Sequence, residues 1–224
     1  MKIDLHVHTR YSEDAINSPE WIMRMARRRG LDGVAVTDHN IIRGWKSMQE
    51  AAKRHSMELV LGEEIKVTQA GEKAGEIIGL FLNEEIKRGD ALDVIDKIRQ
   101  QDGIVVIAHP FDRTKGFRNL ESFLPKVDAI EAFNSRVLSP LTNARAFEYA
   151  ALKGAGMTGG SDAHIPLEVG LGYTAVECSD LEGFRKALKR KETSAEGRMI
   201  PLPINLSGKG LMSMKKAAWR FARM

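Results

Sequence analysis

The chain has 224 residues, 43% of them hydrophobic and 29% charged, so it can bury one sizeable core like an ordinary globular protein. No run of about 18 apolar residues occurs, and we therefore expect no transmembrane helix. The single Cys178 cannot form an internal disulfide; this suits a reducing compartment, and we expect a cytoplasmic protein without a cleaved signal. The net charge of +4 is uneven: residues 185–224 carry eleven Lys or Arg against two Glu, a balance of +9, whereas the remainder carries 23 basic and 28 acidic residues, a balance of −5.

Short apolar segments alternate with helical patterns along the chain. The expected strands cover residues 2–7, 31–40, 57–65, 75–82, 104–110, 127–133, 155–164 and 172–177. The segment 75–82 follows a turn at Gly71 and could equally be the arm of a hairpin. The expected helices cover residues 18–30, 44–55, 91–103, 139–154 and 180–191; the first has Ser18 at its N-cap and Pro19 in its first turn. This alternation predicts βαβ units in the α/β class with a mostly parallel sheet, and six or seven such units favour a closed or distorted barrel over an open sheet.

The last 29 residues differ from the rest of the chain. We expect one domain over residues 1–195 and a basic tail over residues 196–224. Within this tail a helix is expected over residues 208–224, because apolar residues recur there at helical spacing: Leu211, Met214, Ala218 and Phe221. The tail could dock on its own barrel, pair with another subunit, or bind an anionic membrane or nucleic acid; docking on the barrel is favoured. The oligomeric state stays open.

Polar side chains collect at the carboxyl ends of the expected strands. Five of the six histidines lie there, and only His55 lies in a helical pattern. In a (β/α) barrel these ends share the face that carries the chemistry. Histidines and carboxylates together are the ligand set for Zn, Mn or Fe. The candidate ligands are His6, His8, Glu13 or Asp14, His39, Glu64, Glu76, His109, Asp162 and His164.

This set is larger than one metal requires, and it predicts two or three divalent ions bridged by carboxylates. His6 and His8, two residues apart on a strand, point to the same side and can bind the same ion. Closely spaced metals suit the hydrolysis of phosphate esters, because they neutralise the phosphate and activate a water molecule.

Two pairs of residues have supporting roles in this interpretation. Asp4 and Asp38 are expected to orient ligand imidazoles through the free ring N–H, with simple hydrogen bonding at the strand end as the equal alternative. Gly159 and Gly160 are expected to let the backbone approach the metals closely, although a tight turn explains them nearly as well.

Five segments occur in a characteristic order: "DLHVHT", "VTDHN", "GEEI", "IAHP" and "GGSDAH". Together they resemble the five motif regions of the PHP (polymerase and histidinol phosphatase) family, over roughly residues 1–190. Within that family the chain is most similar to the stand-alone phosphoesterases related to nucleoside 3′,5′-bisphosphate phosphatases.

The resemblance implies a distorted (β/α)7 barrel with a two- or three-metal centre and a nucleophilic hydroxide. The first metal would have His6, His8, Glu64 and Asp162 as ligands. Glu64 would bridge to a second metal shared with His109. The third would have Asp14, His39 and His164, with Asp14 preferred to Glu13. Asp162, His164 and His39 are the expected catalytic residues.

This sequence departs from the family pattern at Glu76, where relatives often have a histidine. Glu76 can still act as a ligand, but its negative charge favours harder metals such as Mn²⁺. It could also leave the second site weak or empty.

Basic residues near these motifs are expected to bind substrate phosphate, with Arg136 preferred and Arg43 and Arg113 as further candidates. For Arg113, and for its neighbours Lys115 and Arg118, a solvated loop is the favoured alternative. The expected activity is hydrolysis of a phosphate ester of a small metabolite or nucleotide. A phosphodiesterase that trims short oligonucleotides and a non-catalytic metal-binding scaffold stay open. The negative balance of the body argues against a stable complex with duplex nucleic acid.

Overall fold

The computed structural model describes residues 1–221, and the side chains of all of these except residues 209 and 218–221. The strands are β1 (Lys2–Val7), β2 (Gly33–Val36), β3 (Glu58–Gln69), β4 (Glu72–Leu80), β5 (Gly89–Asp90), β6 (Ile104–Ile107), β7 (Ala129–Asn134), β8 (Gly156–Gly160), β9 (Gly172–Ala175) and β10 (Ser194–Gly197). The helices are α1 (Pro19–Arg28), α2 (Trp45–His55), α3 (Ala91–Gln100), α4 (Leu120–Phe123), α5 (Pro140–Lys153), α6 (Leu181–Arg190) and α7 (Leu202–Phe221), with short 3₁₀ turns η1 (Leu124–Lys126) and η2 (Pro166–Glu168).

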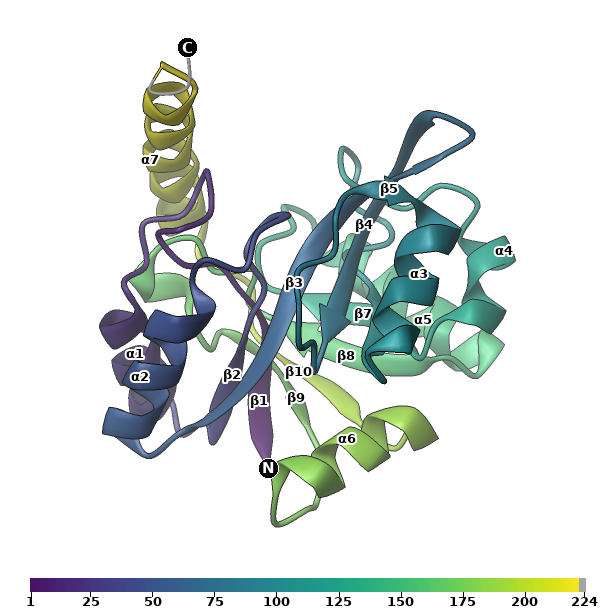
Figure 1. Ribbon diagram of the computed structural model, residues 1–224, viewed down its shortest axis with the longest axis horizontal. Helices are drawn as coiled ribbons and strands as arrows, with labels where there is room; N and C mark the ends of the chain where they lie inside the picture. The colour runs from purple at the N-terminus through teal and green to yellow at the C-terminus, as the bar shows by residue number, and fades with distance from the viewer. Residues whose placement is uncertain (222–224) are drawn as a thin grey trace.

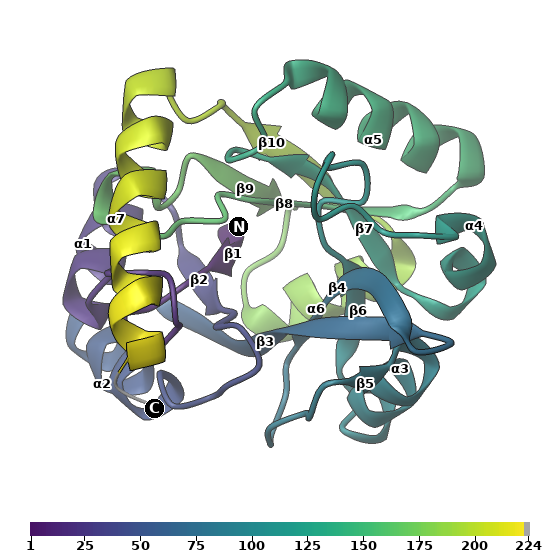
Figure 2. The ribbon, with the colours of Figure 1, turned by 90° about the horizontal axis from the view of Figure 1, so that it is seen from above.

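The strands form one curved sheet in the order β10-β9-β1-β2-β3-β4-β6-β7-β8, with β5 paired to β3. The sheet comes close to closing, because Ala163, just after β8, forms a parallel bridge with Val7 of β1. Seen from above, strands surround a central space with helices outside them (Figure 2). The expected class, an α/β protein with a distorted barrel, is therefore confirmed.

The sheet is mixed rather than mostly parallel. β1, β2 and β3 are parallel to one another, as are β6, β7 and β8. β4 is antiparallel to both of its neighbours, and β9 is antiparallel to β1 and β10. The reason is local: a turn at Ala70 and Gly71, both with positive φ, folds β3 and β4 into a hairpin without a crossover helix.

Helix capping follows the sequence closely. Ser18 accepts a hydrogen bond from the backbone N–H of Trp21 at the start of α1, and Ser139 accepts one from Leu141 at the start of α5. Gly154 ends α5 in the left-handed conformation. These caps fix where α1 and α5 begin. Each of these two helices starts a few residues after a loop that carries polar residues of the motifs.

The interior of the barrel is apolar toward the amino ends of the strands. Ile3 and Leu5 of β1 belong to one buried cluster with Ile104 of β6. Phe184 and Leu188 of α6 complete this cluster, and α6 lies across the bottom of the barrel (Figure 1). A second, larger core lies between the outer helices and the sheet and includes Ile22, Met48 and Ile98. Polar side chains are thereby confined to the opposite end.

The C-terminal segment differs in detail from the expectation. α7 starts at Leu202, earlier than the predicted residue 208, and stands over one side of the upper rim (Figure 1). Leu211 and Met214 of the predicted apolar face are exposed, whereas Asn205 is buried against the barrel. The side chains of Ala218 and Phe221 lie outside the described residues. The division at residue 195 falls inside β10 and stays a prediction. None of the described helices is long and apolar enough to cross a membrane.

Candidate metal centre

The upper end of the barrel brings together histidine and carboxylate side chains from separate parts of the chain. They follow or belong to β1, β2, β3, β4, β6 and β8, and all are buried: His6, His8, Asp14, His39, Glu64, Glu76, His109, Asp162 and His164. Glu64 lies in the middle of β3 rather than at its end, because the strand continues into the hairpin. Glu76 reaches the same cluster from the antiparallel strand β4. The structure thus gathers all nine predicted ligands.

One group of potential ligand atoms contains the first two histidines. His6 Nε2 and His8 Nε2 are 3.1 Å apart, and each lies 3.4 Å from Glu64 Oε2. Asp162 Oδ1 lies 3.3 Å from His8 Nε2 and 3.7 Å from His6 Nε2. These four residues are the set that the family resemblance assigns to the first metal.

A second group surrounds His109. Its Nε2 lies 3.1 Å from Glu64 Oε1 and 3.4 Å from Glu76 Oε2. The two oxygens of Glu64 therefore face different groups, as a bridging carboxylate requires. Glu76 also lies 4.0 Å from His39 Nδ1. Glu76 therefore faces ligand atoms in two groups.

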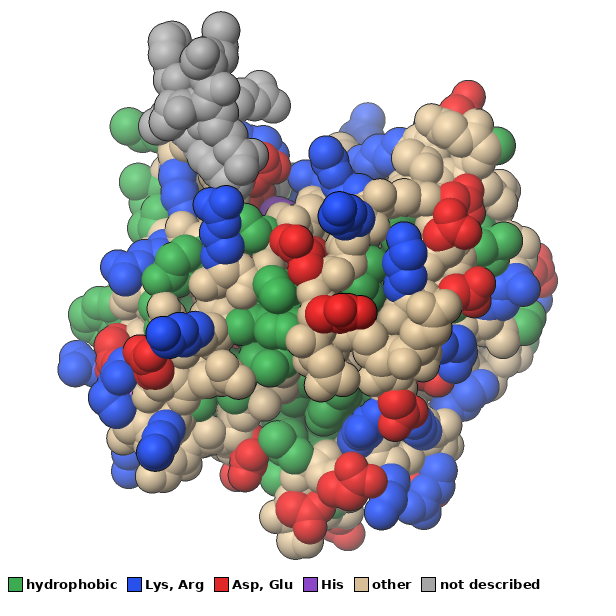
Figure 3. Space-filling model, viewed as in Figure 1, with side chains coloured by type: hydrophobic (Ala, Val, Ile, Leu, Met, Phe, Trp, Pro, Cys, Tyr) green, Lys and Arg blue, Asp and Glu red, His purple; other side chains and the backbone are tan. Residues whose placement is uncertain are grey.

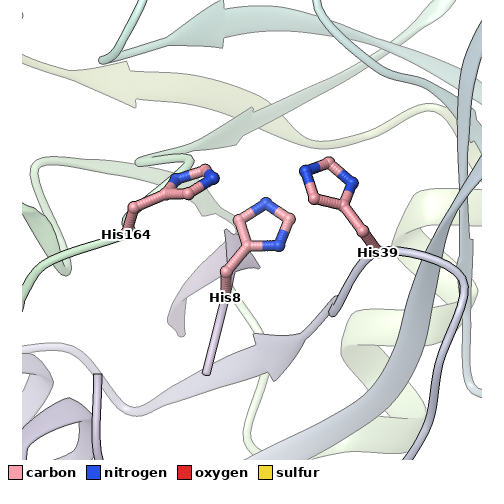
Figure 4. A group of neighbouring side chains, drawn as sticks. All are labelled: His8, His39 and His164. Atoms are coloured by element: carbon pink, nitrogen blue, oxygen red, sulfur yellow. The ribbon is translucent and has the colours of Figure 1, made fainter. Parts of the chain in front are cut away.

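The third group joins His8, His39 and His164, whose rings face one another (Figure 4). Asp14 lies between two of them, with Oδ2 3.4 Å from His39 Nε2 and Oδ1 3.5 Å from His164 Nε2. Glu13 points away from the cluster and pairs with Lys66 at 3.2 Å and Lys216 at 2.8 Å. Of the two alternatives left open by the sequence, Asp14 is the carboxylate in position to act as a ligand.

The chemistry of the cluster fits divalent metals. The buried atoms that have no hydrogen-bond partner among the described residues include Glu64 Oε2, Glu76 Oε2, Asp162 Oδ1 and His164 Nε2. A buried polar atom left unpaired costs free energy, about 1–3 kcal/mol each. Metal coordination would satisfy these atoms, and sets of three ligand atoms lie within 4.8 Å of one another. The donor types, imidazole nitrogen and carboxylate oxygen, suit Zn, Mn or Fe.

Electrostatics in the metal-free protein favour charged pairs. Burial alone lowers the pKa of His39, but the carboxylates of Glu64 and Asp14 outweigh it and raise that pKa to about 10. Burial alone raises the pKa of Glu64, but the neighbouring His39 and His6 hold it well below its usual range. In contrast, burial together with the nearby imidazoles of His164 and His39 lowers the pKa of His8. His8 is therefore a neutral imidazole, the form that binds a metal.

The backbone turns sharply at two of the candidate ligands. His109 has φ +26° and Asp162 has φ +53°, in the left-handed region that non-glycine residues seldom adopt. The absence of a side chain at Gly160 also matters for the cluster, because a Cβ there would lie 2.4 Å from His6 Cβ and 3.0 Å from Glu131 Oε1. The glycine lets β8 approach β1 and its histidine closely.

The residue that orients His6 is Glu131, which the sequence interpretation missed. Glu131 Oε1 lies 2.9 Å from His6 Nδ1, an arrangement that leaves Nε2 free for a metal. Its Oε2 accepts hydrogen bonds from the backbone N–H of His109 at 2.8 Å and from Asn134 Nδ2 at 2.9 Å. One signal was present: Glu131 is the only charged residue within the apolar segment "AIEAF".

The expectation for Asp4 and Asp38 as imidazole-orienting residues was wrong, and simple hydrogen bonding describes both. Asp4 accepts hydrogen bonds from the backbone and hydroxyl of Ser161 and from the Gly170 backbone. Asp38 accepts from the backbone and hydroxyl of Thr9. Burial is the main cause that raises the pKa of Asp4 to about 6 and that of Asp38 to about 7. These carboxyls tie loops together next to the cluster.

Beside the cluster a cavity of about 130 Å³ is lined by His109, Asp112, Thr114, Lys115, Arg136, Val137, Asp162 and Met212. The half-buried Lys115 places its ammonium 4.0 Å from Glu76 Oε2. Burial alone lowers the pKa of Lys115, but Asp162 and Glu76 outweigh it and raise that pKa. Lys115 is the cation that the sequence interpretation undervalued, because its loop carries several basic residues and only the fold shows which one turns inward.

The three arginines proposed for substrate binding have different positions. Arg136 is buried at the cavity, where its guanidinium pairs with Glu168 and contacts Met212. Arg43 and Arg113 are exposed and do not line the cavity. All three assignments stay predictions. The space-filling view shows Lys and Arg side chains around a hollow at the top of the molecule, with histidine visible inside it (Figure 3).

Comparison with known families agrees with this geometry. A family model described as the PHP domain matches residues 4–166, and one described as PHP-associated matches residues 140–193. Because the first match covers well over half of the chain, this protein belongs to the PHP domain family. The specific similarity to bisphosphate phosphatases is not among these findings.

Two uncharacterised proteins of Methanocaldococcus jannaschii are similar in sequence. One is 37% identical over 146 residues, which are 60% of this chain and 82% of the relative. The other is 35% identical over 182 residues, which are 77% of this chain and 69% of the relative.

Two solved structures share the fold. One is a two-domain protein from Bacteroides vulgatus that contains a predicted PHP-like metal-dependent phosphoesterase, with TM-score 0.73, 24% identity, and coverage of 88% of this chain and 65% of that chain. The other is a lesion-specific endonuclease from Pyrococcus furiosus, with TM-score 0.60, 16% identity, and coverage of 84% of this chain and 56% of that chain. At such identities the likeness extends to the fold alone.

Proposed function

We propose that this protein is a metal-dependent phosphoesterase that hydrolyses a phosphate ester of a small metabolite or nucleotide. The observation that carries the proposal is the buried cluster of nine ligands with unpaired oxygen and nitrogen atoms, which adjoins a cavity lined by Lys115 and Arg136. Membership in the PHP domain family supports the same class of reaction. Nucleoside 3′,5′-bisphosphates are the first substrates that we would test.

Three ligand sets would hold two or three ions of Mn, Zn or Fe, with Glu64 as the bridging carboxylate. When bound, such ions neutralise phosphate charge and lower the pKa of a coordinated water to about 7. Asp162 and His8 would fix one side of the reacting centre, and His39 and His164 the other. All four side chains are buried within the barrel.

Lys115 supplies the positive charge that a phosphate ester requires beside the metals. Its ammonium lies next to a carboxylate of the cluster. Bound metal ions would neutralise the cluster's carboxylates, and the ammonium would then turn toward an anionic substrate. Arg136 is held by Glu168 and would contribute to the electrostatic potential of the cavity rather than swing toward the substrate.

The cavity can receive the reacting phosphoryl group of a substrate. Its volume is about 130 Å³, and Met212 of α7 closes one side. Trimming of short oligonucleotides remains the alternative that the assay must separate, since an endonuclease shares the fold.

The test is phosphate release by the purified full chain with Mn²⁺, Zn²⁺ or Fe²⁺. The substrate panel contains an aryl phosphate, phosphorylated metabolites, a nucleoside 3′,5′-bisphosphate and di- to tetranucleotides. Turnover of phosphate monoesters supports the proposal. Turnover of oligonucleotides alone would favour the nuclease, and no turnover of any ester with metal bound would favour the scaffold.

The histidines offer a matched pair of variants for this assay. His39→Ala removes a proposed ligand, whereas His55→Ala removes the one histidine outside the cluster, which pairs with Glu20 at 2.8 Å. We expect His39→Ala to lose activity and His55→Ala to keep it. Equal activity of both variants would contradict the assignment.

A further inference from the structure

The ammonium group of Lys215, on α7, lies inside the loop that connects β1 to α1. Its Nζ donates hydrogen bonds to the carbonyl oxygens of Arg10 at 2.6 Å and Ser12 at 2.7 Å, and also to that of Ala15. An ammonium has three N–H donors, and here each has a carbonyl partner. These carbonyls come from within six consecutive residues, so one side chain from the end of the chain holds the middle of a loop near its beginning.

The loop held in this way carries Asp14. This carboxylate lies between His39 and His164, 3.4 and 3.5 Å from their Nε2 atoms. Ser12 and Ala15, two of the residues whose carbonyls Lys215 binds, flank Asp14 in sequence. The far end of the loop has its own anchor, because Asn17 Nδ2 donates to the carbonyls of His8 and Ala163. Ser12 Oγ also accepts a hydrogen bond from the backbone N–H of His39, and Lys215 adds three contacts to the centre of the loop.

Other contacts fix the position of α7 on the barrel and thereby place Lys215 next to the loop. Asn205 Nδ2 donates to the carbonyl of Arg136 at 3.1 Å, and Asn205 lies almost three helical turns before Lys215. Gly208 lies directly over Glu168, since a Cβ there would lie 2.8 Å from Glu168 Oε1. Met212 contacts the guanidinium of Arg136. The helix therefore faces the barrel with polar and small residues, while Leu202, Leu206 and Met214 are exposed.

The burial of a lysine head group against a loop needs a reason, because removing an ammonium from water is costly. Burial lowers the pKa of Lys215, and the negative charges of Asp14 and Asp38 partly offset this. The neighbouring Lys216 forms a salt bridge to the half-exposed Glu13. Two adjacent lysines thus contact the same loop in different ways, one through backbone carbonyls near the cluster and one through a side chain on the outside.

We propose that Lys215 is a positioning residue of the metal centre, which holds Asp14 in place for the ligand set that Asp14 forms with His39 and His164. The inference rests on the proposed function in that it assumes a metal at this set. It goes further because it makes α7 part of the site. This helix lies beyond residues 4–193, which the two family models match. The tail would then complete the loop as well as cover the cavity.

The experiment compares Lys215→Met and Lys216→Met in the full chain with the wild type. Hydrogen exchange of residues 9–17 is measured in the metal-free proteins, and Mn²⁺ and Zn²⁺ are titrated calorimetrically into the same samples. Lys215→Met should speed exchange in the loop and weaken metal binding at one site, the set that includes Asp14, by about 10- to 100-fold, the usual cost of losing a group that supports a ligand. Lys216→Met should change neither by more than about twofold.

Each other outcome counts against a specific part of the proposal. Faster exchange in Lys215→Met with unchanged metal titration would show that Lys215 anchors the tail only, and would overturn the positioning role. Unchanged exchange would overturn the loop contact itself. If the wild type binds no metal, the proposed function fails with the positioning role, while the exchange data still report on the loop. Circular dichroism of each variant excludes general unfolding.

Discussion

The two ends of the barrel are built from the same strands but serve different purposes. At the lower end, Ile3 and Leu5 of β1 pack with Phe184 of α6 in a closed apolar cluster. At the upper end, His6 and His8 of the same segment face buried carboxylates. Apolar burial stabilises the fold, whereas buried carboxylates with unpaired oxygens destabilise it until a ligand satisfies them. The comparison indicates that, inside the barrel, apolar packing is concentrated at one end and chemistry at the other.

The sharpest way to test this separation is Asp162→Asn at the upper end. The variant keeps the shape of the side chain but removes the negative charge that faces His6 and His8. We expect kcat/KM for a phosphate monoester to fall on the order of 10³-fold, comparable to the loss of a group that stabilises transition-state charge. The melting temperature of the metal-free protein should change little. Full activity in the variant would contradict the assignment.

The reverse result is expected from Phe184→Ala at the lower end. This fully buried ring fills the bottom of the barrel, and its removal should lower the free energy of unfolding by about 3–5 kcal/mol. Urea denaturation measures this change. At a temperature where the variant stays folded, its metal stoichiometry should equal that of the wild type. A loss of metal binding in the folded variant would show that the two ends are coupled.

Glu131→Gln tests whether the upper end is preorganised by its own surroundings. The substitution keeps the size of the side chain but removes the carboxylate that holds His6 Nδ1. We expect metal affinity to fall about 10- to 100-fold, as measured by competition with a chelating dye. Glu121→Gln serves as the control, because Glu121 pairs with Lys153 on the surface. Equal affinity in both variants would be incompatible with an orienting role for Glu131.

The smallest effect is expected from Lys115→Met, which removes the cation beside the cavity. A charged hydrogen bond contributes about 1.5–3 kcal/mol, so KM for a phosphate ester should rise by about tenfold or more while the stability stays nearly constant. Arg118→Met is the matched control on the same loop, since Arg118 is exposed and pairs with Glu72. If the two variants have the same KM, Lys115 does not contact the substrate.

Much of the site could be predicted from the sequence because the motifs are local. "DLHVHT" places two histidines on one strand, and a barrel brings strand ends together wherever they occur in the chain. The choice between Glu13 and Asp14 could not be made in this way. It requires the fold, in which Glu13 pairs with Lys66 and Lys216 on the outside of the cluster.

Other features required the folded chain for a similar reason. Glu131 orients His6 across 125 residues of sequence, and Lys215 reaches Ala15 of the first loop across 200. Contacts between residues so far apart in the sequence produce no periodic pattern from which they could be predicted. Asp4 and Asp38 misled the prediction because a carboxylate near a histidine in sequence need not reach its ring, and here both turn to neighbouring loops instead. The antiparallel direction of β4 agrees with the hairpin-arm alternative for residues 75–82, but the sequence did not decide between the two alternatives, since an apolar strand carries no mark of its direction.

The metal content of the purified protein tests the central claim most directly. Wild-type protein and Asp162→Asn are loaded with Mn²⁺ or Zn²⁺, dialysed, and analysed by elemental mass spectrometry alongside His55→Ala. The nine-ligand cluster predicts two or three equivalents in the wild type and in His55→Ala, with fewer in Asp162→Asn. A wild-type protein that retains no metal, or the same content in all three proteins, would contradict the account.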